Sequence, residues 1–93
     1  MPSRLHLNIQ GRVQGVCYRM YTQDQARALG VRGWVRNRRD GSVELMAEGD
    51  DAALQGLLQW CWKGSPSAHV TRIEDRWQDA TGEFTDFVVA PTH

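Results

Sequence analysis

Hydrophobic and polar residues alternate strictly in the first segment of the chain. From Arg4 to Gln10, the apolar side chains of Leu5, Leu7 and Ile9 fall on one face and polar side chains fall on the other. A period of two residues is typical of a strand with one buried face. The sequence therefore predicts that the chain opens with a half-buried strand.

A second alternating segment predicts a hairpin in the middle of the chain. Residues 42–48 alternate between apolar side chains and two glutamates with a methionine, and residues 31–37 are rich in valine, which favours strands. Asp40 and Gly41 stand between the two segments, and this pair is typical of a tight turn. We expect residues 31–37 and 42–48 to form an antiparallel pair.

Two helices are predicted from composition and from a longer period. Residues 20–29 are rich in helix formers and end at Gly30, where a left-handed cap is favoured. A second helix is expected to begin near Asp50 or Asp51, either of which can cap it, and to end at Gly64. Its apolar residues recur at the spacing of one buried stripe: Leu54, Leu57, Leu58 and Cys61.

The remaining segments complete a recognisable order of elements. Residues 70–78 are predicted to form a fourth strand and residues 84–89 a short last one, which gives βαββαβ with an extra C-terminal strand. No repeat or linker interrupts this order, so we expect one domain over residues 1–93. The predicted fold class is α+β, a ferredoxin-like sandwich with two helices on one face of an antiparallel sheet and the opposite face open to solvent.

Composition limits the partners and the compartment. The 11 basic and 11 acidic residues balance, so no net field attracts a nucleic acid or an anionic membrane, and any anion site must be local. The amino terminus lacks the apolar stretch of a secretory signal, so we expect a cytoplasmic protein, and we expect a monomer. Cys17 and Cys61 are expected to be free thiols, with no metal and no cofactor.

The predicted order of elements places an anion site at one edge of the sheet. The first two strands should be parallel with the third between them, so the loop after the first strand faces Asn37 across about 10 Å. Gly11 and Gly15 let that loop wrap closely around a ligand, and the following helix directs unpaired N–H groups at it. Arg19 adds a planar guanidinium that can hold two phosphate oxygens.

Two blocks of sequence resemble the acylphosphatase family. Residues 11–19 read Gly-Arg-Val-Gln-Gly-Val-Cys-Tyr-Arg, which is similar to the family's signature loop, with Tyr18 where a phenylalanine is common. Residues 33–37 and 40–44 resemble its second block, and the similarity runs from Leu5 to about Val89. The atypical end, residues 90–93, is expected to be disordered.

The resemblance implies a reaction and a set of site residues. The substrate would be a small-molecule acyl phosphate, hydrolysed by direct in-line attack of water to a carboxylate and inorganic phosphate, with phosphate or sulfate binding as a product-like anion. Arg19 and Asn37 would be the catalytic residues, with Asn37 orienting the water. The phosphate would be bound by the Arg19 side chain together with the backbone N–H groups of Gln14, Gly15, Val16, Cys17 and Tyr18.

Other functions fit the residues less well. A cysteine phosphatase would need a longer loop between Cys17 and Arg19, and a base-binding module of this fold would need aromatic residues in 42–48. The loop also lacks the Gly-Lys-Ser/Thr ending of a nucleotide-binding P-loop. A non-catalytic regulatory module that binds a small anion remains the alternative, and Asn37 discriminates, because binding alone does not require it.

The sequence predicts no catalytic or binding role for several charged residues and for the histidines. The three arginines of the hairpin, Arg36, Arg38 and Arg39, stand among acidic residues, so we interpret them as a solvated hairpin rather than a nucleic-acid patch. The three histidines are expected on solvent-facing strand or loop positions: His6, His69 and His93.

Overall fold

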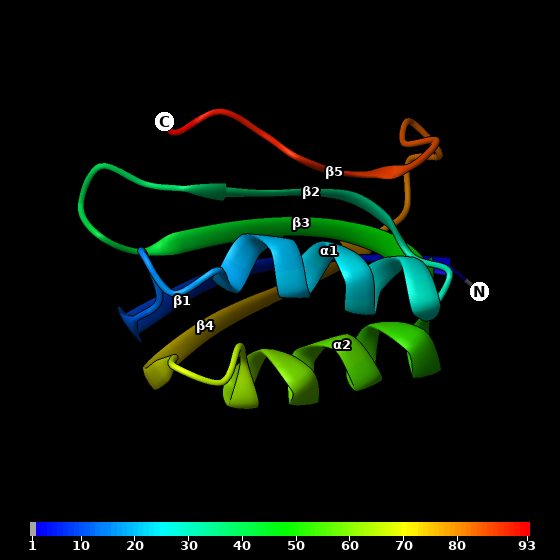
Figure 1. Ribbon diagram of the computed structural model, residues 1–93. Helices are drawn as coiled ribbons and strands as arrows, with labels where there is room; N and C mark the ends of the chain where they lie inside the picture. Colours follow the sequence, from blue (N-terminus) through cyan, green and yellow to red (C-terminus); the bar gives the residue numbers. More distant parts are fainter. Residues whose placement is uncertain (1) are drawn as a thin grey trace.

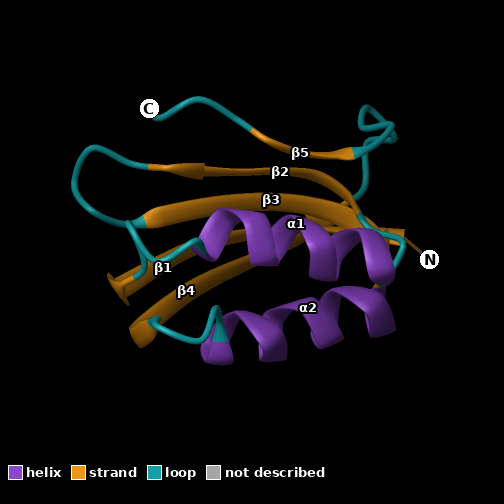
Figure 2. Cartoon of the chain, in the orientation of Figure 1, coloured by secondary structure: helices purple, strands orange, loops and turns teal. Residues whose placement is uncertain are grey.

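One mixed sheet covered on one face by two helices makes up the structure, a computed structural model that describes residues 2–93 (Figures 1 and 2). Its fold class is the predicted ferredoxin-like α+β sandwich with a short C-terminal strand. In chain order the elements are β1 (Pro2–Arg12), α1 (Tyr18–Ala28), β2 (Arg32–Asn37), β3 (Val43–Asp50), α2 (Asp51–Lys63), β4 (His69–Asp79) and β5 (Phe87–Val89).

The strand order is β4-β1-β3-β2-β5, which confirms the predicted split βαβ arrangement. β3 pairs antiparallel with both β1 and β2, so β1 and β2 are parallel to each other and α1 connects them. β4 is antiparallel to β1, as expected. The short C-terminal strand β5, whose direction the sequence did not predict, pairs in parallel with β2 and makes the sheet mixed at this edge.

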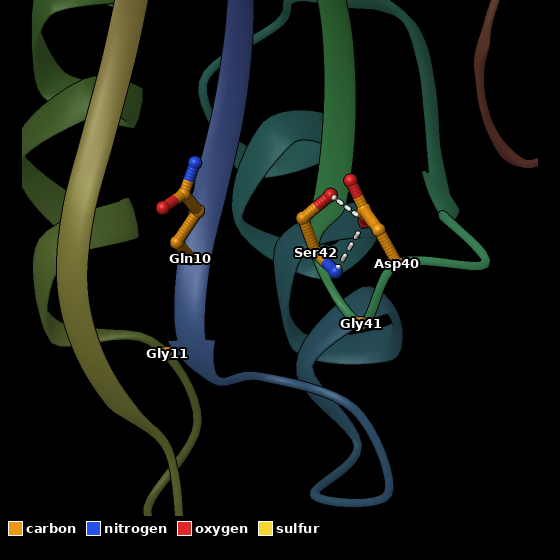
Figure 3. Close-up of a pocket in the computed structure, with 5 residues that line it drawn as sticks. All are labelled: Gln10, Gly11, Asp40, Gly41 and Ser42. Atoms are coloured by element: carbon orange, nitrogen blue, oxygen red, sulfur yellow. Dashed lines mark hydrogen bonds between the residues drawn. The ribbon is translucent and has the colours of Figure 1, made fainter.

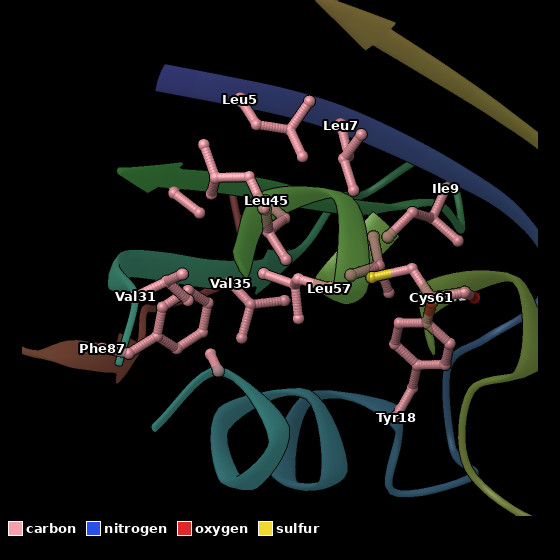
Figure 4. Packing of buried hydrophobic residues seen from close by; sticks show 14 of the residues in the cluster. Leu5, Leu7, Ile9, Tyr18, Val31, Val35, Leu45, Leu57, Cys61 and Phe87 are labelled. Carbon is pink, nitrogen blue, oxygen red and sulfur yellow. Dashed lines mark hydrogen bonds between the residues drawn. The ribbon is translucent and has the colours of Figure 1, made fainter. Parts of the chain in front are cut away.

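The core lies between the sheet and the helices, where the predicted apolar faces meet (Figure 4). Leu5, Leu7 and Ile9 are fully buried, which confirms the alternation of β1. On α2 the buried stripe consists of Leu54, Leu57 and Cys61, while Leu58 of the predicted stripe is only partly buried. Each fully buried aliphatic side chain contributes roughly 1.5–3 kcal/mol to folding.

The helix boundaries differ from the expectation in detail. α1 begins at Tyr18, two residues earlier than predicted, and Gly30 follows its end with a φ of 74°. Asp50 is the N-cap residue of α2 but makes no side-chain cap hydrogen bond, and Asp51 instead accepts a hydrogen bond from the Ser3 hydroxyl. The predicted N-cap position is therefore confirmed at Asp50, but its side chain does not make the capping hydrogen bond. Neither helix within residues 2–93 has the length and apolar character needed to cross a membrane.

We expected the sheet face opposite the helices to be open to solvent, but part of it is buried. Glu44 on β3 is only 9% exposed. It accepts hydrogen bonds from Arg36 and Arg38, and it lies 2.7 Å from Nε2 of His6. Burial alone would raise the pKa of Glu44, but these three partners outweigh burial and lower the pKa to about 2. His6 is thus a partner of a buried carboxylate and not a free surface residue.

Glu48 is the second buried carboxylate on that face, and it holds a loop. It accepts a hydrogen bond of 2.7 Å from Nε of Arg4 and 2.9 Å bonds from the backbone N–H groups of Thr81 and Gly82. Burial would raise the pKa of Glu48, yet these bonds lower it to about 2. The loop between β4 and β5 is therefore fastened to the centre of the sheet by one carboxylate.

The C-terminal residues continue beside β2, contrary to the expected disorder. The N–H of Ala90 donates to the carbonyl of Val35 over 2.9 Å, and that of His93 donates to the carbonyl of Asn37 over 3.0 Å. Figure 1 shows the C terminus, the β1–α1 loop and the β2–β3 turn at the same end of the molecule. The elements that flank Asn37 therefore include the tail.

Candidate functional site

The loop of residues 13–17 starts where β1 can no longer pair regularly. Gly11 has a φ of 128° and lies at a register shift of the β1–β4 pair. A Cβ atom built on it would stand 2.2 Å from the carbonyl oxygen of His69. Only glycine allows β4 to approach this closely. After this shift β1 pairs with β4 as far as Arg12, and the chain then enters the loop.

The backbone of the loop alternates in hand. Gly15 has a φ of 73° and Cys17 has a φ of 60°, whereas Gln14, Val16 and Tyr18 do not adopt positive φ. Cys17 is the one non-glycine residue with positive φ among residues 2–93. Alternating hands turn successive N–H groups towards one point and form a concave nest that favours an anion. A left-handed non-glycine residue is strained, and such strain often marks a functional site.

The amino terminus of α1 adds to this positive potential. Cys17 is its N-cap residue and offers no side-chain cap, and the first turn contains no acidic residue. The first N–H groups of the helix therefore lack the acceptors that usually satisfy them. Together with the helix dipole they make the space in front of α1 favourable for a negative charge.

Tyr18 anchors the loop to the second helix. Its ring is buried, and its hydroxyl donates to the carbonyl of Cys61 over 2.6 Å (Figure 4). That carbonyl lies in the last turn of α2, where backbone acceptors lack helical partners. Burial raises the pKa of Tyr18, so its phenol stays protonated as a donor. The hydroxyl thus gives the Cys61 carbonyl a donor, which a phenylalanine at this position could not supply.

Arg19, in the first turn of α1, contributes a permanent charge to a pocket of about 340 Å³. Unlike Arg4, Arg36 and Arg38, it forms no ion pair within residues 2–93. An unpaired guanidinium is free to bind an anion bidentately. The pocket is lined by Val13, Gln14, Gly15, Cys17, Tyr18, Arg19, Met20, Asn37 and Val89.

Asn37 ends β2 and lines the same pocket. Its backbone is held on both sides, because it pairs with Val43 of β3 and its carbonyl accepts from His93. Its side-chain Oδ1, in contrast, is buried and has no hydrogen-bond partner within residues 2–93. Leaving a buried acceptor unpaired costs about 1–3 kcal/mol. Asn37 also lines the pocket, so a bound molecule that reaches its carboxamide would give this atom a partner.

The structure brings most of the predicted site residues to one pocket. Gln14, Gly15, Cys17, Tyr18 and Arg19 line it from the loop and α1, and Asn37 lines it from β2. Val16 does not line this pocket. It faces a neighbouring one that shares only two of these residues and is lined by Arg12, Gly15, Val16, Cys17, Tyr21, Pro66 and Ser67.

Three apolar lining residues were missed by the sequence reasoning. Val13 is buried, whereas Met20 and Val89 are exposed apolar side chains at the rim. Met20 follows the signature loop and could have been noticed there. Val89 had no signal, because it reaches the pocket only through the pairing of β5 with β2.

Another hollow lies nearby, but its charge is wrong for an anion. It has a volume of about 350 Å³ and is lined by Gln10, Gly11, Asp40, Gly41 and Ser42 (Figure 3). Asp40 accepts hydrogen bonds from the N–H and the hydroxyl of Ser42, which lower the pKa of Asp40. The hollow therefore presents a carboxylate and no cation.

Neither cysteine has, in the described part of the chain, a neighbouring base that would activate its thiol as a nucleophile in the pocket. Cys61 is fully buried, and burial raises the pKa of its thiol to about 12, so it stays protonated. Cys17 is exposed and has no side-chain hydrogen bond within residues 2–93. In the same part of the chain, no three His, Cys, Asp or Glu side chains gather as metal ligands would.

Comparison with known proteins agrees with this architecture. The acylphosphatase family model matches residues 5–89. The acylphosphatase of Pelotomaculum thermopropionicum is 51% identical over 88 residues, covering 95% of this chain and 96% of its own length. That of Methylococcus capsulatus is 51% identical over 86 residues, covering 92% of this chain and 94% of its own.

A solved structure is similarly close. The crystal structure of acylphosphatase from Bacillus subtilis superposes with a TM-score of 0.92 at 35% identity, covering 95% of this chain and 98% of that one. The match thus extends over the sheet, both helices and the loop between β1 and α1. The chain belongs to the acylphosphatase family.

Proposed function

We propose that the protein hydrolyses acyl phosphates to a carboxylate and inorganic phosphate by direct attack of water. The observation that carries this proposal is the unpaired, buried Oδ1 of Asn37 in the same pocket as the loop nest and Arg19. Family membership supports the same activity, because the relatives compared above bear the name acylphosphatase. The pocket supplies two separate functions, anion binding and water positioning.

Phosphate binding falls to the loop and Arg19. The N–H groups of residues 14–18 and the guanidinium of Arg19 donate to the phosphoryl oxygens, where negative charge is held in the transition state. These donors are set before the substrate arrives, because Tyr18 is anchored to α2 and the loop is held at Gly11. Preorganised donors stabilise the transition state without a reorganisation cost.

Water positioning falls to Asn37. Its Oδ1 accepts a hydrogen bond from water and directs the water oxygen at phosphorus, in line with the bond to the acyl oxygen. As the new P–O bond forms, the old one breaks and its electron pair leaves with the carboxylate, which is a weak base and needs no general acid. The lining residues include no Asp, Glu or His, so the proton of water passes to a phosphoryl oxygen.

The alternative of a non-catalytic anion-binding module is less well supported. An anion offers acceptors, and a carbonyl oxygen such as Oδ1 of Asn37 needs a donor. A module that only binds phosphate would gain nothing from a buried, unpaired acceptor beside the anion, and it would bear the cost. A water molecule between Oδ1 and the phosphate satisfies both groups. This arrangement favours hydrolysis over binding alone.

We further propose that the protein acts as a cytoplasmic monomer on a small molecule, without a nucleic-acid or membrane partner. The equal numbers of acidic and basic residues argue against a polyanionic partner, since the protein has no net charge to attract one. On the hairpin, Arg36 and Arg38 are occupied by Glu44. Light scattering coupled to size exclusion should give the mass of one chain. A dimer would contradict the proposed state.

One assay tests the activity directly. Purified protein is mixed with an aroyl phosphate at neutral pH, with and without a metal chelator, and in parallel with an alkyl phosphate monoester. We expect cleavage of the aroyl phosphate alone, unaffected by the chelator, because only the carboxylate leaves without a proton. Equal cleavage of the monoester, or no cleavage of either compound while phosphate still binds, would favour another function.

A further inference from the structure

Gln14 connects the two halves of the candidate site through its side chain. Its Nε2 donates one hydrogen bond of 2.7 Å to the carbonyl of Arg38 and another of 2.9 Å to the carbonyl of Ser42. Both neighbours are carbonyl oxygens, which only accept, so the amide nitrogen and not its oxygen must face them. Both protons of the amide are therefore used on the β2–β3 turn.

The two carbonyls belong to the pair that closes this turn. The N–H of Arg38 donates to the Ser42 carbonyl over 2.8 Å, and the N–H of Gly41 donates to the Arg38 carbonyl over 3.1 Å. Arg38 directly follows Asn37 in the chain. A displacement of the Arg38–Ser42 pair therefore moves the Cα of Asn37 and the direction in which its carboxamide points.

No other side chain makes this connection in the part of the chain that is described. Asn8 reaches the turn from β1 by a 3.2 Å bond to Ser42, but Asn8 is not in the loop. His93 holds the backbone of Asn37 from the opposite side, and it is not in the loop either. Among the hydrogen bonds of residues 2–93, the link from the loop 13–17 to the turn comes from Gln14.

We propose that Gln14 is a positioning residue, whose carboxamide fixes the β2–β3 turn, and with it Asn37, at a set distance from the phosphate loop. The inference rests on the proposed function, in which the loop holds phosphate and Asn37 holds water. The separation of those two groups determines whether water stands in line with the breaking bond. An error of about 1 Å in such a separation can lower a rate about a hundredfold.

Replacing Gln14 with methionine tests this role, because methionine has a similar length and no amide donor. We expect kcat to fall by about tenfold to a hundredfold, while the inhibition constant of inorganic phosphate changes by less than about threefold, since the loop amides and Arg19 remain. Gln14→Asn keeps the amide on a shorter chain that reaches one carbonyl at most, and it should give an intermediate kcat. Gln55→Met, which changes an exposed amide on α2 outside the pocket, is the matched control and should retain full activity.

A double-mutant cycle separates positioning from general damage to the loop. If Gln14 acts through Asn37, adding Gln14→Met to Asn37→Ala should lower the residual rate by no more than about twofold, because no carboxamide is left to displace. Losses that multiply, or a phosphate inhibition constant that rises in parallel with the loss of kcat, would overturn the proposal. Multiplying losses would give Gln14 a role independent of Asn37, and the parallel rise in the inhibition constant would assign it to phosphate binding.

A measurement independent of activity distinguishes this inference from the proposed function. In ¹⁵N-labelled protein, the side-chain NH₂ signals of Asn37 should shift in Gln14→Met and Gln14→Asn but not in Gln55→Met. If the wild type fails to hydrolyse acyl phosphates while this shift occurs, the proposed function is wrong and the mechanical link stands. Unchanged Asn37 signals in a folded Gln14→Met protein would refute the link whatever the activity.

Discussion

Two side chains have separate proposed roles in the pocket: Arg19 binds the charged phosphate, and Asn37 orients the attacking water. Arg19 brings a charge that no carboxylate of residues 2–93 neutralises. Asn37 brings one acceptor atom with no partner. Arg19 should influence the affinity for phosphate, and Asn37 should influence only the rate of hydrolysis of the bound substrate. Kinetics of single variants can separate these effects.

Arg19→Ala should weaken phosphate binding and turnover together. The loss removes a bidentate, charge-assisted contact to the phosphoryl group, so kcat/KM should fall by about a hundredfold or more. Arg19→Lys should recover only part of the loss, because an ammonium cannot hold two oxygens in one plane. Steady-state kinetics with inorganic phosphate as inhibitor checks both variants. Phosphate inhibition at the wild-type level in Arg19→Ala would remove Arg19 from the binding site.

Asn37→Ala should abolish most turnover while inorganic phosphate still binds. We expect kcat to fall about a hundredfold, with an inhibition constant for phosphate within about threefold of wild type. The melting temperature should not fall, because the variant loses no hydrogen bond of Oδ1 and removes an unpaired buried acceptor. Gln55→Ala, which changes an exposed amide on α2 outside the pocket, is the control for activity. An active Asn37→Ala enzyme would show that water is positioned by another group.

At the scale of elements, the end of α2 supports the start of α1. Gly64, which ends α2, has a φ of 67°, and a Cβ atom on it would lie 2.5 Å from the ring of Tyr18. Tyr18 in turn packs against Trp60, with 5.8 Å between ring centroids. The loop nest therefore depends on a close approach between two helices far apart in the sequence.

Gly64→Ala should destabilise the fold and loosen the loop. The left-handed backbone and the contact with Tyr18 together predict a loss of about 1–3 kcal/mol in the free energy of unfolding. Gly30→Ala is the matched control, since Gly30 has a φ of 74° but open space around its Cβ position. Urea unfolding of both variants isolates the cost of the contact. Equal losses in the two variants would mean that the Tyr18 contact contributes nothing.

At the scale of the whole molecule, two buried carboxylates tie the far face of the sheet together. Glu44 joins β1 to the hairpin through His6, Arg36 and Arg38, and Glu48 joins β1 to the loop before β5. Both have pKa values lowered to about 2. In the unfolded chain a glutamate titrates near 4.3. The folded state therefore binds fewer protons than the unfolded state between these values.

The stability that Glu44 and Glu48 provide should be fully present above about pH 5 and lost as the pH falls towards about 2, because protonation then favours the unfolded chain. Glu48→Gln should lower the unfolding free energy at pH 7 by about 1–3 kcal/mol. It should also flatten the pH dependence, which urea unfolding from pH 2 to 7 can measure. Glu74→Gln, on the exposed strand β4, is the control. A wild-type slope retained in Glu48→Gln would exclude Glu48 as its source.

Much of the architecture was readable from local pattern. The burial alternation of β1, the Asp40–Gly41 turn and, apart from Leu58, the apolar stripe of α2 each depend on neighbours in the sequence, and each was predicted correctly. The partial exposure of Leu58, the start of α1 at Tyr18 and the uncapped Asp50 were not, because these details depend on which elements pack nearby. The parallel pairing of β5 depends on the path of a long loop and had no local signal.

By itself the sequence determined the order of elements and the chemical types at the candidate site, because hydrophobic period, turn residues and the signature loop are local properties of the chain. Tertiary structure alone decided what surrounds those residues: the unpaired Oδ1 of Asn37, the burial of Glu44 and Glu48, and the two hydrogen bonds of Gln14 to the turn. The physical reason is that burial and hydrogen bonding across strands join residues distant in the chain, and no sequence period records them.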